Sequence, residues 1–287
     1  MMVRNGELDL HVAIDGDDDA PPLLMLHGIT SSSATWGWFV PELSERFRVL
    51  RLDFRGHGRS DRAPDAYDPD GYVSDAVTAL ERVAGGPAIV VGHSLGGLTT
   101  AVLTQHHPDL VVAAVMEDPP LYAGRPDEAS PLSGNTLLDG FRLMRQSIPQ
   151  LQEAGLDVAT LVGVLGPAPD PTRRSTFAEA LHPDALEALA AALIDVDATV
   201  LDPVLAGAMP PWTHPDRPFA VPGLLFAGDP TLPDTAARPA AVDHVAGLSP
   251  ELEVLTVDGA GHLIHDGVES RATFRDATIA FLDRVAP

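Results

Sequence analysis

A serine flanked by glycines is the residue of this chain best suited to chemistry. It lies in Gly92-His93-Ser94-Leu95-Gly96-Gly97, which follows a predicted buried strand over Ala88–Val91 and precedes a predicted helix over Leu95–His107. A serine on such a strand-to-helix turn projects its hydroxyl outward, toward the positive end of the following helix. The same glycine pattern also occurs by chance, so a plain glycine-rich turn is the alternative interpretation.

The hydroxyl of Ser94 would need a base, and the base would need a carboxylate to orient it. His262 lies in Gly259-Ala260-Gly261-His262, directly after a predicted strand over Leu252–Val257. Asp229 ends the preceding predicted strand, Gly223–Ala227. The order Ser94, Asp229, His262 is the one expected for a nucleophile elbow on a parallel sheet. These residues therefore predict a catalytic triad.

Acyl transfer through a serine also needs backbone N–H groups that stabilise an oxyanion. One such donor comes from the residue after the nucleophile and the other from an earlier loop. Leu95 supplies the first, and the His27-Gly28-Ile29 segment offers the second through the N–H of Ile29. The sequence thus contains every part of a serine hydrolase site.

Composition excludes several other chemistries. All 18 basic residues among the 287 are arginine, and cysteine is absent. A chain without lysine forms no Schiff base and has no phosphate-loop lysine, and one without cysteine has no thiolate nucleophile and no disulfide. The formal net charge of -23 argues against nucleic acid or an anionic membrane as a partner, since both need a basic surface.

The elements that must position these residues alternate between short apolar runs and helix-like segments. The predicted strands are Glu7–Ile14, Pro22–Leu26, Val49–Phe54, Ala88–Val91, Leu110–Met116, Gly223–Ala227 and Leu252–Val257. The predicted helices between and after them are Gly71–Val83, Leu95–His107, Thr235–Gly247 and Val268–Val285. This alternation predicts an α/β fold with a parallel sheet covered by helices on both faces.

Residues 119–222 break the alternation. The segment has three Pro/Gly-rich stretches and helix-like runs such as Thr136–Gln146 and Asp184–Ile194, with no convincing strand. We therefore expect a helical insertion between two parts of the core, which would comprise residues 1–118 and 223–287.

With these motifs the chain resembles the α/β-hydrolase superfamily over nearly its whole length. The matching pieces are His27-Gly28, the segment Asp53–Ser60, Gly92–Gly96, Asp229 and Gly261-His262. The resemblance implies a mostly parallel, doubly wound sheet of eight strands and makes residues 119–222 a helical cap inserted after strand 6. It also implies a serine esterase or lactonase that needs no cofactor.

The identity of the triad acid stays open at this point. Some members of the superfamily carry the acid after the strand that follows the nucleophile helix, which makes Asp118 the alternative to Asp229. We favour Asp229 because it ends the strand used most often. Serine at position 94 argues against dehalogenase and epoxide hydrolase activities, which use an aspartate nucleophile in this superfamily.

Predictions beyond the triad are less direct. Gly28, Trp36, Phe141 and Trp212 are candidate pocket residues, each with ordinary packing as its alternative, and no metal site is expected because His262 and His265 lack a third ligand nearby. A small neutral, apolar ester or lactone is the expected substrate, while the oligomeric state is left open. The N-terminus lacks a basic start followed by an apolar core, so we expect a cytoplasmic protein.

Two other functions fit the same residues. Carbon–carbon bond hydrolases and cofactor-free haloperoxidase-like members share the Ser-His-Asp set. A non-catalytic small-molecule receptor on the same fold is the alternative of another class, although such receptors usually have a damaged triad.

Overall fold

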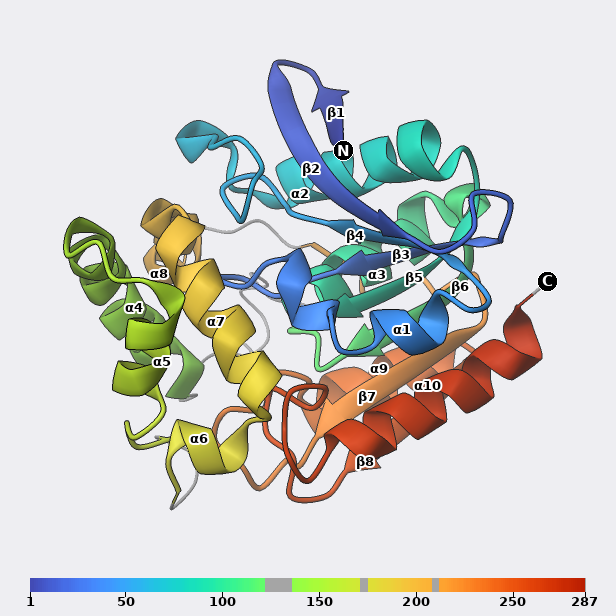
Figure 1. Cartoon of the computed structure of the whole chain (residues 1–287). Coiled ribbons are helices and arrows are strands. Elements are labelled where there is room, and N and C mark those ends of the chain that lie inside the picture. The colour runs from blue at the N-terminus through green and yellow to red at the C-terminus, as the bar shows by residue number, and fades with distance from the viewer. Residues whose placement is uncertain (122–135, 171–174, 208–211, 287) are drawn as a thin grey trace.

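An eight-stranded sheet forms the centre of the computed structural model, which describes residues 1–121, 136–170, 175–207 and 212–286 (Figure 1). The strand order is β1-β2-β4-β3-β5-β6-β7-β8. Strands β1, β2 and β4 pair antiparallel, and all other neighbours pair parallel. The predicted α/β fold with a mostly parallel, doubly wound sheet of eight strands is therefore confirmed.

The bounds of the elements are as follows. The strands are β1 Met2–Asn5, β2 Leu8–Asp15, β3 Pro22–Leu26, β4 Arg48–Leu52, β5 Ala88–His93, β6 Val111–Glu117, β7 Gly223–Gly228 and β8 Leu252–Val257. The α-helices are α1 Val40–Leu43, α2 Pro69–Ala79, α3 Leu95–His106, α4 Thr136–Glu153, α5 Val158–Leu165, α6 Phe177–Ala180, α7 Pro183–Asp195, α8 Asp202–Ala206, α9 Pro239–Leu248 and α10 Arg271–Val285.

Alternate residues of the central strands enter two hydrophobic cores, one on each face of the sheet. In β3, Leu24 and Leu26 pack in the core that includes residues of α2, α3 and α9, whereas Leu23 and Met25 pack in the core that includes α1 and α10. Successive side chains of a strand point to opposite faces, so an uninterrupted apolar run is what a strand buried on both faces requires. The two cores hold the sheet rigidly beneath the loops at its carboxyl edge.

In its described parts, the block between β6 and β7 contains helices joined by turns and irregular segments, and its one internal β-bridge is between Pro169 and Thr176. Helices α4 to α8 belong to it and lie to one side of the sheet, at the left of Figure 1. A division of the chain into a core and a cap stays a prediction, but the position of these helices is compatible with it.

The structure differs from the sequence predictions mainly at short elements and helix ends. Strand β1 and the four-residue helix α1 were not predicted, and α4 continues to Glu153 with Pro149 inside it. Helix α10 begins at Arg271 rather than at Val268, because Gly267 and the preceding residues form a compact loop next to β6. Such ends depend on tertiary contacts that local patterning does not contain.

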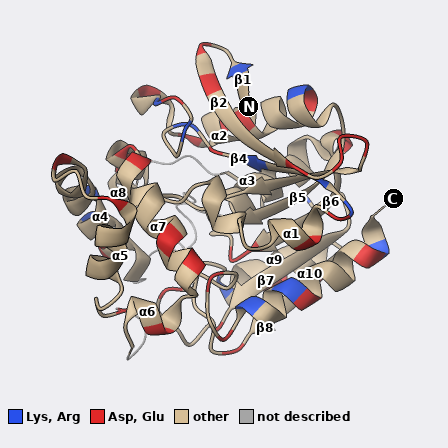
Figure 2. Cartoon of the chain, viewed as in Figure 1, with Lys and Arg blue, Asp and Glu red and all other residues tan. Residues whose placement is uncertain are grey.

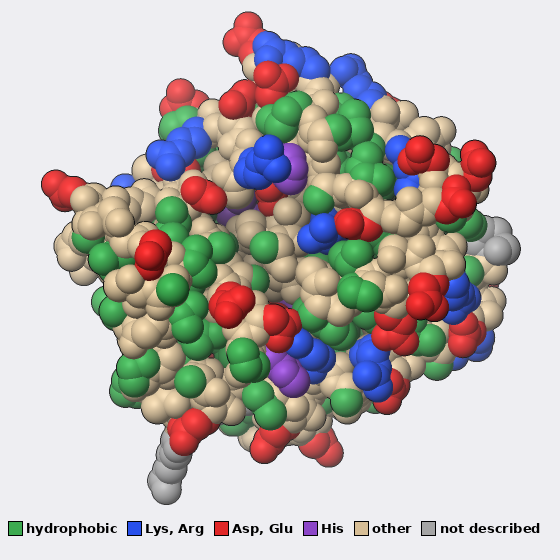
Figure 3. Space-filling view, in the orientation of Figure 1, with side chains coloured by type: hydrophobic (Ala, Val, Ile, Leu, Met, Phe, Trp, Pro, Cys, Tyr) green, Lys and Arg blue, Asp and Glu red, His purple; other side chains and the backbone are tan. Residues whose placement is uncertain are grey.

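Acidic side chains are spread over many elements rather than gathered on one (Figure 2). On the face drawn in Figure 3, arginine side chains lie among them. This distribution is that of a solvated surface. Among the described residues no helix combines the length and the apolar character needed to cross a lipid bilayer.

Candidate active site

Ser94 sits on a sharp turn between β5 and α3. Its φ angle is +51°, in a region that side chains other than glycine rarely adopt. A Cβ atom at Gly92 would collide with the backbone of Gly96, and one at Gly96 would collide with the backbone of Leu26. The two glycines therefore let three chain segments approach closely, and the strained turn between them points the hydroxyl of Ser94 away from the sheet.

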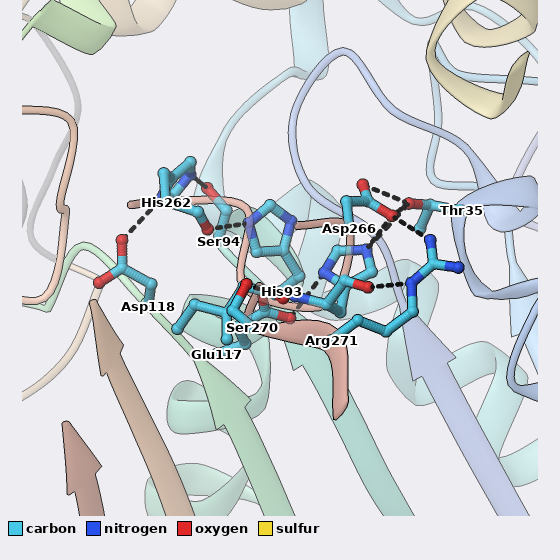
Figure 4. A network of polar contacts seen from close by, with 11 residues as sticks. Thr35, His93, Ser94, Glu117, Asp118, His262, Asp266, Ser270 and Arg271 are labelled. Carbon is cyan, nitrogen blue, oxygen red and sulfur yellow. Dashed lines mark hydrogen bonds and ion pairs between the residues drawn. The ribbon is translucent and has the colours of Figure 1, made fainter. Parts of the chain in front are cut away.

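The side chains of Ser94, His262 and Asp118 form one hydrogen-bonded chain (Figure 4). The Ser94 hydroxyl lies 2.8 Å from Nε2 of His262, and Nδ1 of His262 lies 2.6 Å from Oδ2 of Asp118. All three residues are buried. Nδ1–H of His262 donates to the carboxylate, which leaves Nε2 free to accept the serine proton.

Three backbone N–H groups hold the carboxylate of Asp118 in place. Gly228 and Ala237 donate to Oδ1 at 3.2 and 3.0 Å, and Ala236 donates to Oδ2 at 2.8 Å. Asp118 itself has a positive φ of 41°, directly after β6. Because so many donors fix its position, this carboxylate can orient His262 and stabilise a positive charge on its ring.

Asp229, the acid favoured from the sequence, does not reach His262. Its partly exposed carboxylate accepts from Thr231, at 2.6 Å from the hydroxyl and 2.9 Å from the N–H, and from the N–H of Gly259 at 2.9 Å. These hydrogen bonds, that of the Thr231 side chain foremost, lower the pKa of Asp229 below its ordinary value. The prediction of Asp229 as the acid was therefore wrong, because its carboxylate stabilises a turn instead of contacting His262. The alternative, Asp118, is the carboxylate next to Nδ1 of His262.

The two expected oxyanion donors lie on either side of Ser94. Leu95 begins α3, and Ile29 lies in the loop after β3 and lines the cavity described below. Neither N–H donates to an acceptor among the described residues. The neighbouring Thr30 has a φ of +62° and donates its N–H to Nε2 of His57 at 3.2 Å, which fixes the loop. Both donors are thus available to a ligand.

Side chains also hold the backbone of His262. The carboxylate of Asp234 accepts the N–H of His262 at 3.1 Å, and Nε2 of His93 lies 3.0 Å from its carbonyl oxygen. Burial, with a smaller contribution from His262 and His265, lowers the pKa of His93 well below its ordinary value, so the ring is a neutral donor. Nothing in the sequence around Asp234 distinguished it from other loop acids.

A second carboxylate–imidazole pair lies beside the first. Oε2 of Glu117 is 2.7 Å from Nδ1 of His265, and Oε1 accepts the N–H of His265 at 2.9 Å. With His93 these residues bring three candidate ligand atoms within 4.8 Å of one another. Each of the three side chains already has a hydrogen-bond partner in the protein, so hydrogen bonding alone accounts for the cluster.

A cavity of about 500 Å³ opens onto Ser94 and His262. Mostly apolar residues of α4 form one wall, and residues of α5, α6 and α7, the segment before α6 and the loops after β3, β7 and β8 contribute to the rest of the lining. Phe141 of α4 lines it, as predicted, next to Met144 and Ile148. A cavity of this size and character suits a small organic ligand.

The other three predicted pocket residues are not among those that line this cavity. Trp36 is fully buried and stacks on His265 with ring centroids 4.3 Å apart. Trp212 stacks on Tyr72 at 6.1 Å. A Cβ at Gly28 would lie 2.7 Å from the ring of His93, so Gly28 serves close packing beside the nucleophile turn.

Comparison with known proteins agrees with the fold. A family model described as "Alpha/beta hydrolase family" matches residues 23–277. The chain belongs to the α/β hydrolase family. A crystal structure of E-2-(acetamidomethylene)succinate hydrolase superimposes with a TM-score of 0.74 at 25% identity, covering 99% of this chain and 98% of that one.

Two curated relatives are similar at the level of sequence. A 2-(acetamidomethylene)succinate hydrolase of Mesorhizobium japonicum is 38% identical over 113 residues, which span 39% of this chain and 40% of that protein. The sn-1-specific diacylglycerol lipase ABHD11 of Mus musculus is 26% identical over 293 residues, which span 94% of this chain and 83% of that protein. The first match thus covers less than half the length of its relative.

Proposed function

We propose that this α/β hydrolase is a serine hydrolase that cleaves a carboxylic ester or lactone. The observation on which the proposal rests is the unbroken chain of hydrogen bonds from Ser94 through His262 to Asp118. The two unused N–H groups of Ile29 and Leu95 beside the nucleophile support it, since they provide an oxyanion hole.

In the proposed reaction Ser94 attacks the carbonyl carbon of the substrate while His262 accepts the serine proton. The N–H groups of Ile29 and Leu95 stabilise the oxyanion of the tetrahedral intermediate, and each such donor contributes about 10² to 10³ in rate. His262 then gives its proton to the leaving alcohol. A water deprotonated by His262 releases the acid and restores Ser94, and Asp118 stabilises the imidazolium in both halves of the cycle.

The cavity supports a small substrate that is mainly apolar. Residues between positions 136 and 193, those of α4 foremost, form most of its wall, which is the role we propose for residues 119–222 as a cap over the site. The two relatives are named as a diacylglycerol lipase and a 2-(acetamidomethylene)succinate hydrolase, and both names are compatible with attack on a carbonyl carbon.

Turnover of p-nitrophenyl butyrate by the purified protein tests the proposal. The wild-type protein should release p-nitrophenol, and Ser94→Ala should lower kcat by about 10⁶ because the nucleophile is lost. Gly247→Ala is a suitable control, since a Cβ at this position of α9 has no neighbour within 4 Å. A wild-type protein inert to small esters and lactones, or a Ser94→Ala variant with full activity, would contradict the acyl-enzyme mechanism.

A further inference from the structure

A second group of buried polar side chains lies beside the triad. It consists of Thr35, Glu117, His265, Asp266 and Arg271, and we call it the Asp266 cluster. Figure 4 shows Thr35, Asp266 and Arg271 on one side of the network, with Ser94, His262 and Asp118 on the other. The proposed reaction uses none of the five side chains.

His265 has short hydrogen bonds to two members of the cluster. Its Nδ1 lies 2.7 Å from Glu117, and its Nε2 lies 2.9 Å from the hydroxyl of Thr35. Burial alone would lower the pKa of His265, but the carboxylates of Asp266 and Glu117 outweigh it and raise the pKa above the ordinary value. The hydroxyl of Thr35 lies between Nε2 of His265 and Oδ2 of Asp266, within hydrogen-bond distance of both.

Asp266 has no contact of comparable length. The hydroxyl of Thr35 lies 3.2 Å from Oδ2, Nε2 of His265 lies 3.4 Å from Oδ1, and a nitrogen of Arg271 lies 3.8 Å from Oδ1. Hydrogen bonds to a carboxylate are ordinarily about 2.7–2.9 Å long. The residue is nevertheless only 7% exposed. Asp266 is thus a deeply buried carboxylate without a strong partner.

Arg271 makes its short side-chain contacts with another acid. It lies 2.9 Å from both carboxylate oxygens of Asp184, and only 3.8 Å from Oδ1 of Asp266. The carboxylate of Asp266 is therefore the one in this region to which a further cationic donor could add a short contact. Burial, the largest cause, also raises the pKa of Asp266 above its ordinary value.

Asp266 and Thr35 belong to the wall of the same cavity that contains Ser94 and His262. Two further acids, Asp170 and Asp234, also line it, and no arginine does so among the described residues. A ligand bound to Ser94 therefore shares one cavity with Asp266.

We propose that Thr35 and Asp266 form a subsite for a protonated amine on the acyl chain of the substrate, which makes the substrate class an amino-acyl ester. The inference rests on the proposed function, because the ester must lie at Ser94. An ammonium group supplies the short, charge-assisted hydrogen bond that Asp266 lacks among the described residues. The apolar side chains of α4 and α7 accommodate the methylene chain between the ester and the amine.

Methyl esters of matched acids test the subsite. The series compares ω-amino esters of four, six and eight carbons with the unsubstituted methyl esters of the same length, and includes monomethyl adipate as the carboxylate analogue. A charge-assisted hydrogen bond is worth about 1.5–3 kcal/mol, so at the best length kcat/KM for the amino ester should exceed that for the plain ester about 10- to 100-fold. Monomethyl adipate should be the poorest of the six-carbon substrates.

The ratio of kcat/KM for amino and plain esters is then measured in three variants. Asp266→Asn should bring the ratio close to one, and Thr35→Val should lower it, because both changes weaken the carboxylate subsite. Asp139→Asn makes the same change on the exposed side of α4, where Asp139 pairs with Arg142, and should leave the ratio as in the wild type. Since the ratio is internal to each variant, a general loss of activity does not affect it.

Two outcomes would overturn the inference. One is a wild-type protein that shows no preference for the amino ester at any chain length, and the other is an equal effect of Asp266→Asn and Asp139→Asn on the ratio. In both cases turnover of the plain esters would leave the proposed function intact. A wild-type protein that cleaves none of the esters would instead contradict the proposed function itself. If Asp266→Asn does not fold, the subsite is still tested by the ester series with the wild-type protein and by the ratio of kcat/KM in Thr35→Val.

Discussion

Asp118 and Asp229 illustrate what single residues reveal before a structure is known. Each follows the carboxyl end of a strand, and β6 and β7 are neighbours in the sheet, so both acids were expected near His262. What separates them is local backbone conformation. Asp118 has a φ of +41° and faces the ring, whereas Asp229 hydrogen-bonds within its own turn. Sequence patterning identifies the strand ends but contains no information on these angles.

Two buried histidines near the site each accept a backbone hydrogen bond through a ring nitrogen. Nε2 of His57 accepts the N–H of Thr30 at 3.2 Å, and Nε2 of His27 accepts the N–H of Phe54 at 3.1 Å. Burial lowers the pKa of both, that of His57 to about 3. Protonation of either ring would replace an acceptor by a donor and break the contact.

The pKa of His57 predicts a loss of stability in acid. Its folded-state value of about 3 lies below the ordinary value of 6.5, so the unfolded chain takes up the proton first. The stabilisation is fully present above pH 6.5 and is lost as the pH falls toward 3. His57 alone should lower the free energy of unfolding by about 2 kcal/mol between pH 7 and pH 5, measured by urea denaturation.

A glutamine at position 57 removes this titration, so the fall in stability between pH 7 and pH 5 should be smaller in His57→Gln. His106→Gln is the matched control, because His106 is exposed at the end of α3 and its protonation is less coupled to folding. Equal pH dependence of His57→Gln and the wild type would show that His57 is not held neutral.

At the scale of elements, side chains fix the loop between β8 and α10. Asp234 and His93 hold the N–H and carbonyl of His262, while Glu117 and Arg271 hold the N–H and carbonyl of His265. The adjacent residues Glu117 and Asp118 at the end of β6 thus bind two histidines of one loop. Without regular secondary structure, the loop depends on these contacts to place His262.

Removal of Glu117 should therefore destabilise the protein strongly. Glu117 and His265 are fully buried, and loss of one partner of a buried pair costs about 3–5 kcal/mol. The free energy of unfolding of Glu117→Ala, from urea denaturation, should fall by that amount. Asp283→Ala breaks the exposed pair with Arg46 and should cost about 0–1 kcal/mol. Similar losses in the two variants would contradict a structural role for the Glu117–His265 pair.

At the scale of the whole molecule, the order of strands and helices was predictable because apolar periodicity reports burial. The two-sided apolar runs Pro22–Leu26 and Ala88–Val91 became central parallel strands, and the Ser94 turn lies at the carboxyl edge between a strand and a helix as expected. Ser94 and His262 lie within hydrogen-bond distance, as the motifs around them predicted. These features follow from local composition and spacing.

The cavity could not be predicted in the same way. Its wall combines residues of α4 to α7 with loops far away in the sequence. Which residues line the cavity therefore depends on how these helices pack against the loops. Trp36 and Trp212 were reasonable candidates by residue type, yet they pack away from this cavity against His265 and Tyr72. Asp266 and Thr35, 231 positions apart, meet at its wall with no sequence signal that links them.

The triad itself is tested most directly by kcat for p-nitrophenyl butyrate in Asp118→Asn and Asp229→Asn. Each variant removes one carboxylate charge with almost no change of shape. Asp118→Asn should lower kcat by about 10⁴, because asparagine no longer stabilises the correct tautomer and the imidazolium of His262. Asp229→Asn should keep near wild-type kcat, since among the described residues the Asp229 carboxylate accepts from Thr231 and Gly259 and not from His262. Near-full activity in Asp118→Asn together with collapse in Asp229→Asn would contradict the account.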